Sequence, residues 1–336
     1  MKEPYPLKID AYAHIVPPKY REALRKAAPE MHDALIVRHR PLYDLDERFR
    51  VMDKYEPIRQ VLTLGRIPVE HIADPDKAAE LARMANDEMA ELVVRYPHRF
   101  VAALTTLAMN NMEEVLKEID RCIIDLKFKG VYLHTPVDEK PLDEPEFLPL
   151  YDKMLQYDLP IVIHPMRKSD HPDFMTEKES KYTIFSLFGW PYDTTVAMAR
   201  LVFSGIMERH PGLKVVTHHC GGMVPFFAER IRQFTQLYAI RSKGKKLWLK
   251  RQAVDYFRMF YADTAIYGNP TALKCGHEFF GPDNLLFGVD FPLGDVEHGD
   301  RNYRQTINAI EQMNITEEER KKIYQDNARK LMHLPI

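Results

Sequence analysis

Cysteine is scarce in this chain, and long apolar runs are missing. The three cysteines, Cys122, Cys220 and Cys275, lie far apart, and none forms a Cys-x-x-Cys pair. Their number and spacing argue against a disulfide framework or a cysteine zinc site, and they suit the reducing cytoplasm. No run reaches the roughly eighteen apolar residues that a transmembrane helix needs. The chain begins with MKEPYPLKID, which lacks the apolar stretch of a secretory signal peptide.

An excess of one charge is missing too. The 47 lysines and arginines nearly balance the 49 aspartates and glutamates. Nucleic-acid binding depends on a cationic surface that neutralises phosphates, and this composition gives no sign of one. The chain has 336 residues, 45% of them hydrophobic, so it can bury a large core without disulfides. We therefore expect a cytoplasmic globular protein that acts on a small molecule and binds neither nucleic acid nor a membrane.

The chain does contain a regular alternation of short apolar runs and helical patterns. Eight runs have the composition of strands: residues 8–15, 58–64, 100–107, 128–134, 159–164, 214–219, 257–264 and 284–290. Apolar residues at a period near 3.6 predict helices between them, over residues 76–95, 111–120, 147–157, 194–209 and 316–332. Thr316 and Glu319 have the spacing of a capping box at the start of the last helix.

Eight strands that alternate with helices predict a parallel α/β fold, and eight strands close a (β/α)₈ TIM barrel. Such a barrel usually takes about 250 residues. The surplus falls in residues 21–55, after the first strand, and in residues 166–193, after the fifth. We therefore predict a single barrel domain over residues 1–336, with insertions after strands 1 and 5.

Histidine and aspartate recur at the carboxyl ends of the predicted strands, where barrel enzymes build their active sites. The set comprises His14, His134, His164, His218, His219, Asp263 and Asp290. A single histidine at such a place is more often a buried residue that a neighbour satisfies. Several at matched positions favour a shared site.

Three of these residues make a set suited to a divalent metal. His14, His164 and Asp290 each lie at the end of a strand. Two imidazoles and a carboxylate are good ligands for zinc or manganese, and three protein ligands leave a position open for water or substrate. Alternation along the first strand places Tyr12 on the same face as His14. The sequence thus predicts one bound zinc or manganese ion.

His218 and His219 are adjacent, so strand alternation points them to opposite faces. We expect His219 to face the site and His218 to face the helix layer. Gly221 and Gly222 follow, and glycines let the backbone approach a ligand closely. Asp263 is expected either to be the partner of a histidine or to cap a helix.

The ordered set of motifs resembles the amidohydrolase superfamily, in the branch that contains aminocarboxymuconate-semialdehyde decarboxylase, γ-resorcylate decarboxylase and 5-carboxyvanillate decarboxylase. The resemblance covers almost the whole chain. Its landmarks are residues 9–18, Asn86–Asp87, YPHRF at 96–100, residues 163–165, GIMERHPGL at 205–213, HCGGMVP at 219–225, residues 261–264, GVDFP at 288–292 and NARKL at 327–331.

The resemblance implies a (β/α)₈ barrel in which His14, His164 and Asp290 are metal ligands. It implies that His219 is the catalytic histidine that does not bind metal. It also implies a homodimer, because members are often dimers and some receive a substrate-binding arginine from the neighbouring subunit. Arg230 lies on the helix that would carry such an arginine.

The first strand departs from the family pattern. His-x-His or Glu-x-His is usual there, whereas this chain has Tyr12-Ala13-His14. A tyrosine must lose its proton to be a good anionic ligand, and its ordinary pKa is about 10. Three interpretations follow: His14, His164 and Asp290 hold the metal alone, Tyr12 also coordinates it, or the site holds no metal.

The site is compatible with three classes of function. The first is metal-dependent, non-oxidative decarboxylation of an aromatic or unsaturated acid, a lyase reaction in which Asp290 protonates the ring carbon and His219 stabilises charge or relays a proton. This role of Asp290, implied by the resemblance, requires a raised pKa and hence a desolvated pocket. The second is metal-assisted hydrolysis of a lactone, amide or ester, or hydration of a double bond. The third is ligand binding alone by a barrel whose site has decayed at Tyr12.

Several residues are candidates for substrate binding. Residues 166–193 include the aromatic side chains Phe174, Tyr182, Phe185, Phe188 and Trp190, which would form a pocket wall or merely pack on the barrel rim. Tyr12 faces the same end of the barrel. Arg66 follows the second strand and Arg167 the fifth, and either guanidinium has the shape to grip a carboxylate.

Overall fold

Parallel strands form the centre of the protein. A computed structural model describes residues 6–65, 67–241, 247 and 249–336. Its strands are β1 (Lys8–Ile15), β2 (Ile58–Leu64), β3 (Phe100–Ala103), β4 (Thr105–Thr106), β5 (Val131–Thr135), β6 (Ile161–Pro165), β7 (Val215–Thr217), β8 (Tyr261–Asp263) and β9 (Leu285–Leu286). Every pairing is parallel, in the order β1-β2-β3 and then β4-β5-β6-β7-β8-β9.

Backbone hydrogen bonds join these two sheets into one ring. The predicted strand over residues 100–107 is divided at Leu104, whose N–H donates to Leu62 of β2 at 2.9 Å. The next N–H, of Thr105, donates to Gly130 beside β5. At the other seam, the His14 N–H donates to the Phe291 carbonyl at 2.7 Å. β3 and β4 are therefore two segments of one barrel strand. The predicted eight-stranded barrel is confirmed.

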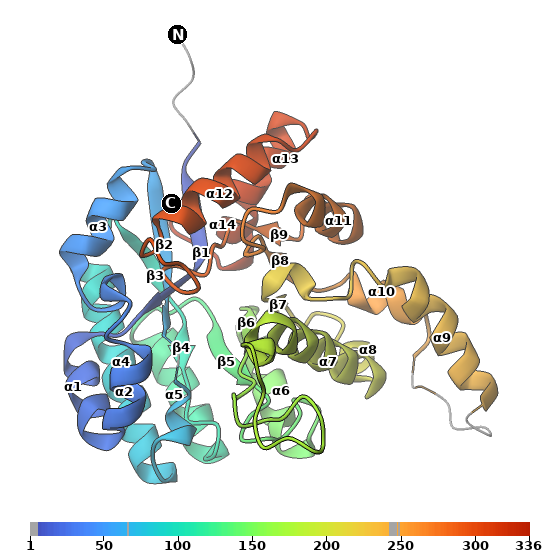
Figure 1. Ribbon diagram of the computed structural model, residues 1–336, viewed down its shortest axis with the longest axis horizontal. Coiled ribbons are helices and arrows are strands. Elements are labelled where there is room, and N and C mark those ends of the chain that lie inside the picture. The colour runs from blue at the N-terminus through green and yellow to red at the C-terminus, as the bar shows by residue number, and fades with distance from the viewer. Residues whose placement is uncertain (1–5, 66, 242–246, 248) are drawn as a thin grey trace.

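Helices cover the outside of the strands (Figure 1). The α-helices are α1 (Pro18–Ala27), α2 (Pro29–Leu35), α3 (Leu45–Asp53), α4 (Pro75–Arg95), α5 (Met112–Ile124), α6 (Leu148–Tyr157), α7 (Trp190–Phe203), α8 (Ile206–Arg209), α9 (Ala228–Arg241), α10 (Ala253–Phe257), α11 (Pro270–Phe280), α12 (Asp300–Glu311), α13 (Glu317–Lys321) and α14 (Asn327–Leu331). Short 3-10 or π turns are η1 (Arg40–Leu42), η2 (Val69–His71), η3 (Pro145–Phe147), η4 (Phe185–Gly189), η5 (His219–Gly221) and η6 (Lys322–Asp326). Within the described residues, no helix has the length and apolar content to cross a membrane.

The two predicted insertions have different structures. The segment after β1 folds into α1, α2, η1 and α3, which lie together on one side of the barrel in Figure 1. The segment after β6 is irregular until η4 begins at Phe185. The helix predicted over residues 194–209 is two helices, because Gly205 adopts a φ of +80° that ends α7 before α8 begins. The predicted capping box of Thr316 and Glu319 is present at α13.

The barrel interior is apolar at the end opposite the polar residues. One side chain or more from nearly every strand enters it, including Ile9, Val61, Leu104, Val162, Val216 and Leu286, all at most 2% exposed. The C-terminal Leu331 and Met332 belong to the same cluster. This packed floor leaves the carboxyl ends of the strands as the place where polar side chains gather.

A buried polar chain ties the first insertion to the barrel. Arg48 of α3 is fully buried and donates from Nη1 to the His14 carbonyl at 2.7 Å and from Nε to Gln60 Oε1 at 2.7 Å. Gln60 donates to the Tyr303 hydroxyl at 2.5 Å, and that hydroxyl donates to Asp10 Oδ2 at 2.6 Å. Burial lowers the pKa of Arg48 to about 10, so the guanidinium stays charged at neutral pH. Its charge thus depends on these acceptors for stabilisation.

We predict that Arg48→Ala lowers the free energy of unfolding by about 2–5 kcal/mol, because it leaves two buried acceptors, the His14 carbonyl and Gln60 Oε1, without their donor. Reversible chemical unfolding followed by circular dichroism measures this change. Arg50→Ala is the matched control: it lies on the same helix, is mostly exposed and pairs with Glu47, so its cost should stay below about 1 kcal/mol. Equal costs for the two variants would contradict the role given to Arg48.

Candidate metal centre and active site

The candidate site lies at the carboxyl ends of β1, β6, β7 and β8 and just beyond β9. His14 is the penultimate residue of β1, His164 is the penultimate residue of β6, and Asp263 is the last residue of β8. His218 and Asp290 follow β7 and β9. Each of these five side chains is at most 4% exposed. The fold therefore gathers residues that are far apart in sequence into one buried polar cluster.

Three residues of this cluster meet the requirements of a metal site. His14 Nε2 lies 3.0 Å from Asp290 Oδ1, and His14 Nδ1 lies 2.9 Å from the Thr63 hydroxyl. His164 Nδ1 donates to the Pro165 carbonyl at 2.5 Å, which leaves Nε2 with a free lone pair. One ligand atom from each of His14, His164 and Asp290 falls within 4.8 Å of the others. The donor set and its compactness fit a divalent ion.

Charge states in the cluster also suit a cation. Burial, followed by the nearby His218, lowers the pKa of His164 well below its usual value, so the ring is neutral and can donate its lone pair. Burial alone would raise the pKa of Asp290, but the hydrogen bond from His14 and the proximity of His218 outweigh it and hold that pKa well below its usual range. The expectation of a raised pKa at Asp290 is therefore wrong for the ion-free chain.

The expected orientation of His218 is also wrong, because strand alternation ends before it. β7 stops at Thr217, and His219 has a φ of +53°, outside strand geometry. The two rings consequently lie on the same side, with centroids 3.8 Å apart. Both face the cluster, and one ligand atom from each lies within 4.8 Å of a carboxylate oxygen of Asp290.

Asp263 is the partner of a histidine, the first of its two expected roles. Its Oδ2 accepts a hydrogen bond from His218 Nδ1. Its Oδ1 accepts from the backbone N–H groups of Cys220 at 3.2 Å and Ala265 at 3.0 Å. Burial lowers the pKa of His218, but Asp263 and then Asp290 outweigh burial and raise it to about 9. An added positive charge is therefore favoured beside these two carboxylates.

Tyr12 lies inside the cluster, beside the candidate ligands. Its ring is 1% exposed and stacks on His218, with centroids 4.2 Å apart and planes 4° apart. Burial raises the pKa of Tyr12 well above its ordinary value, and its hydroxyl has no hydrogen-bond partner among the described residues. The Tyr12 ring thus provides a packing surface for the His218 imidazole.

Two tyrosines of the cluster were not identified from sequence. Tyr132 is buried, contacts Tyr12 edge-on and places its hydroxyl 3.3 Å from His134 Nε2. Its spacing of two residues from His134 was the available signal, because both then share one strand face. Tyr267 donates to Asp290 Oδ2 at 3.4 Å from the loop after β8, and no motif marks it.

The predicted substrate-binding residues are only partly brought together. The Trp190 ring lies 5.8 Å from that of His164 and 6.5 Å from that of His219, and its indole N–H donates to the Arg167 carbonyl at 3.0 Å. Arg167 Nη1 lies 3.3 Å from Asp193 Oδ1. Arg66 lies outside the described residues.

Phe174, Tyr182 and Phe188 are mostly exposed, whereas Phe185 packs edge-on against Trp190. Among the aromatic side chains of residues 166–193 that the structure describes, Trp190 lies beside the histidines of the cluster, and Phe185 packs against it.

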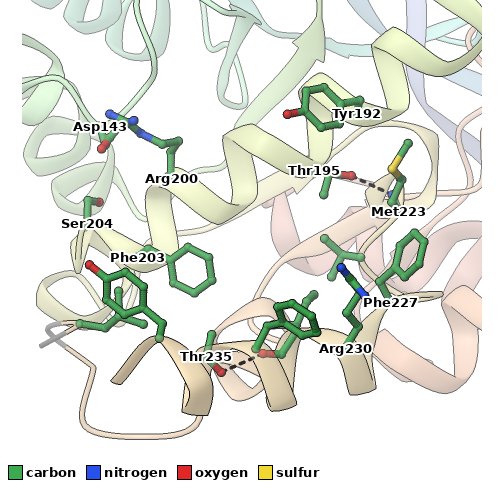
Figure 2. Close-up of a pocket in the computed structure, with 15 residues that line it drawn as sticks. Asp143, Tyr192, Thr195, Arg200, Phe203, Ser204, Met223, Phe227, Arg230 and Thr235 are labelled. Carbon is green, nitrogen blue, oxygen red and sulfur yellow. Dashed lines mark hydrogen bonds and ion pairs between the residues drawn. The ribbon is translucent and has the colours of Figure 1, made fainter. Parts of the chain in front are cut away.

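Arg230 lies elsewhere in the chain. It is on α9 and lines an open cavity of about 700 Å³ between α7 and α9, where its guanidinium sits 4.1 Å from the Phe234 ring centroid (Figure 2). No histidine of the cluster lines this cavity. Within one chain, the structure therefore does not bring Arg230 to the candidate metal centre.

Comparison with known proteins gives consistent results over nearly the full chain. γ-Resorcylate decarboxylase from Polaromonas sp. is 30% identical, covering 89% of this chain and 90% of the relative. 2-Amino-3-carboxymuconate-6-semialdehyde decarboxylase from Dictyostelium discoideum is 27% identical, covering 93% and 88%. Among solved structures, 5-carboxyvanillate decarboxylase from Sphingomonas paucimobilis has the same fold, with a TM-score of 0.85 at 24% identity and coverage of 97% and 99%.

A dihydroxybenzoic acid decarboxylase from Polaromonas sp. JS666 was solved with manganese and the inhibitor 2-nitroresorcinol. It aligns with a TM-score of 0.76 at 26% identity, over 97% of this chain and 96% of that chain. The model of the amidohydrolase family matches residues 9–334. The buried histidine–aspartate cluster at the mouth of a parallel barrel and this match over almost the whole length lead to one conclusion: the chain belongs to the amidohydrolase family.

Proposed function

We propose that this chain is a metal-dependent, non-oxidative decarboxylase of an aromatic acid that carries a hydroxyl group next to the carboxylate, and that it acts as a single catalytic domain. The observation that carries the proposal is the compact buried group of His14, His164 and Asp290 at the barrel mouth. Support for the reaction comes from the relatives, which are named as decarboxylases of γ-resorcylate, 6-methylsalicylic acid and 2-amino-3-carboxymuconate-6-semialdehyde.

We propose that these three residues hold one divalent ion, manganese or zinc. Manganese is present in the solved dihydroxybenzoic acid decarboxylase. Such an ion, held by His14, His164 and Asp290, would supply a Lewis acid that orients the substrate and stabilises its negative charge. Trp190, beside His164 and His219, offers a flat apolar surface against an aromatic ring.

The charge states of this chain determine where the reacting proton originates. Burial, together with His218, lowers the pKa of His219 well below its usual value, so this imidazole is neutral. Asp290, as a metal ligand, would be ionised, because a carboxylate binds a cation in its deprotonated form. Neither residue carries a proton to give at the outset. We infer that Asp290 takes the proton of the substrate hydroxyl and returns it to the ring carbon that bears the carboxylate.

The electron balance then follows. The new C–H bond is formed with an electron pair of the phenolate ring, which becomes a dienone. The C–C bond to the carboxylate breaks, its electron pair returns to the ring, and CO₂ leaves. The regained phenolate takes a proton from water. His219 faces the same space and can donate an N–H to the oxygen on which negative charge develops.

One prediction concerns the products of the proposed decarboxylation. With manganese or zinc, the protein should release CO₂ from 2,6-dihydroxybenzoate or 6-methylsalicylate, and in deuterium oxide the ring should gain one deuterium at the vacated carbon. Gas release and mass spectrometry measure both. A dimethoxy analogue, which has no hydroxyl proton, should not react. Release of a cleaved or ring-opened acid from lactones, amides or esters, without CO₂, would contradict the proposal and favour hydrolysis.

Another prediction concerns the catalytic role of His219. His219→Asn should lower kcat by about 10²- to 10⁴-fold, the range of a positioned acid–base or charge-stabilising group, while the bound metal remains. Steady-state kinetics and metal analysis on the same preparation test this. His98→Asn, an exposed histidine remote from the cluster, is the matched control and should behave as the parent protein. An unchanged kcat in His219→Asn would exclude the histidine from the reaction.

We also propose that the chain forms a homodimer through α9. This helix projects from the body of the barrel (Figure 1). Exposed apolar side chains lie on this helix and on the two residues before it: Phe226, Phe227, Phe234, Tyr238 and Ile240, each at least 40% exposed; we call this set the α9 face. A monomer rarely exposes so many large apolar side chains in one short segment, and a two-fold interface would bury the same segment of both copies.

The α9 face borders the cavity between α7 and α9, into which Phe227 and Arg230 project in Figure 2. A dimer through this face brings Arg230 into the interface, which supports a substrate-binding role for it in the partner's site.

We further propose a reducing, cytoplasmic location. The three cysteines are free thiols, two of them buried, which supports this location.

Light scattering coupled to size-exclusion chromatography should therefore give twice the chain mass of 39.4 kDa. Two charges placed in the α9 face by Phe226→Glu with Phe234→Glu should yield a monomer, because an unpaired carboxylate in an apolar interface is costly. Val94→Glu, at an exposed apolar residue on α4, is the matched control and should leave the dimer intact. A monomeric parent protein, or a dimer that tolerates both charges, would contradict this interface.

A further inference from the structure

His218 has a buried nitrogen, Nε2, that lacks a hydrogen-bond partner among the described residues. Its side chain is fully buried. The nearest acidic atom, Asp290 Oδ1, lies 3.7 Å away, beyond hydrogen-bond distance. A buried polar atom without a partner costs free energy, so such an atom in a polar cluster indicates a missing ligand.

The other nitrogen of the ring fixes which atom offers the lone pair. Nδ1 donates its proton to Asp263 Oδ2. Asp263 is itself held by the backbone N–H groups of Cys220 and Ala265, so its position is set. A cation that displaces the Nε2 proton would therefore find the lone pair of this atom on the side of Asp290. A carboxylate that orients an imidazole in this way is the usual support of a metal-bound histidine.

His218 and the proposed ligands His14 and His164 are linked by one shared carboxylate, that of Asp290. Its ring stacks beside that of His164, with centroids 5.0 Å apart. Two compact groups exist in the cluster, one with His14 and His164 and one with His218 and His219, and Asp290 belongs to both. The carboxylate that would anchor an ion is thus common to His218 and to the ligands already described.

We propose that His218 is a ligand, through Nε2, of the same divalent ion as His14, His164 and Asp290, and that it supplies the further ligand where the first strand of this chain has Tyr12. This inference rests on the proposed function, because it assigns a further residue to that metal site. Tyr12 keeps a structural role, since its ring lies flat against His218 and holds the imidazole in position.

The charge balance of the cluster agrees with a divalent ion at this place. Three neutral imidazoles and the carboxylates of Asp290 and Asp263 carry a charge of −2, which a divalent ion cancels. His219 lies outside this ligand set and is left to contact the substrate.

The test counts ligands directly. The full-length protein is stripped with chelator and loaded with manganese. Metal analysis gives the stoichiometry, titration gives the dissociation constant, and pulsed electron paramagnetic resonance counts the imidazole nitrogens bound to the ion. We expect one ion and three imidazoles in the parent protein. His218→Ala should show two imidazoles and a dissociation constant raised by at least about 10-fold. Loss of a residue that only orients a metal ligand already costs about this much, and loss of a ligand should cost at least as much.

Matched variants separate this role from general damage. Tyr12→Phe should keep three imidazoles and the parent affinity. His134→Ala removes another buried histidine at the same end of the barrel, outside both compact groups, and should also keep three. Tyr12→His combined with His218→Ala should regain a third imidazole, because it restores a histidine at the first-strand position. That regain would also show that loss of His218 does not prevent folding.

The outcomes distinguish this inference from the function on which it rests. One ion with an unchanged imidazole count in His218→Ala would overturn the inference and leave the three-ligand site intact. Two ions per chain would overturn it as well, because His218 would then belong to a second site with His219. A parent protein that binds no manganese or zinc would overturn both the inference and the proposed metal dependence.

Discussion

The arrangement of the cluster depends on one constraint: the Asp290 carboxylate is buried among several imidazoles. Asp290 is 2% exposed, His14 lies 3.0 Å from it and His218 lies 3.7 Å from it. An ionised carboxylate in such a place needs positive charge nearby. In the proposed function, a divalent ion held by the imidazoles of the cluster would meet this need. Metal binding and catalysis would then both follow from one buried charge.

The barrel supplies the geometry that this constraint needs. The proposed ligands come from β1, β6 and the segment beyond β9, so only closure of the ring brings them together. Asp290 itself has a φ of +61°, a conformation that an aspartate tolerates and that turns its side chain into the barrel mouth. The buried chain from Arg48 to Asp10 ends at the backbone of His14. The first insertion therefore supports the site although it contributes no ligand.

Much of this could be predicted from sequence, and the failures have physical causes. The bounds of β1 and β2 were predicted correctly, because both are long buried runs. His14, His164 and Asp290 come together as expected, since each ends a strand of the same barrel. The orientation of His218 was not predictable from alternation, because β7 ends one residue earlier and the backbone turns at His219. The low pKa of Asp290 depends on histidines from distant strands, which no local motif reveals.

The most direct test of the account is a crystal structure of the manganese-loaded protein with anomalous diffraction measured at the manganese edge. The account predicts a single strong peak within about 2.3 Å of nitrogen atoms of His14 and His164 and an oxygen of Asp290, with Nε2 of His218 completing the set. No peak in the cluster of a catalytically active crystal would contradict it. So would a peak bound only by surface residues, because the buried carboxylate would then have no cation to hold.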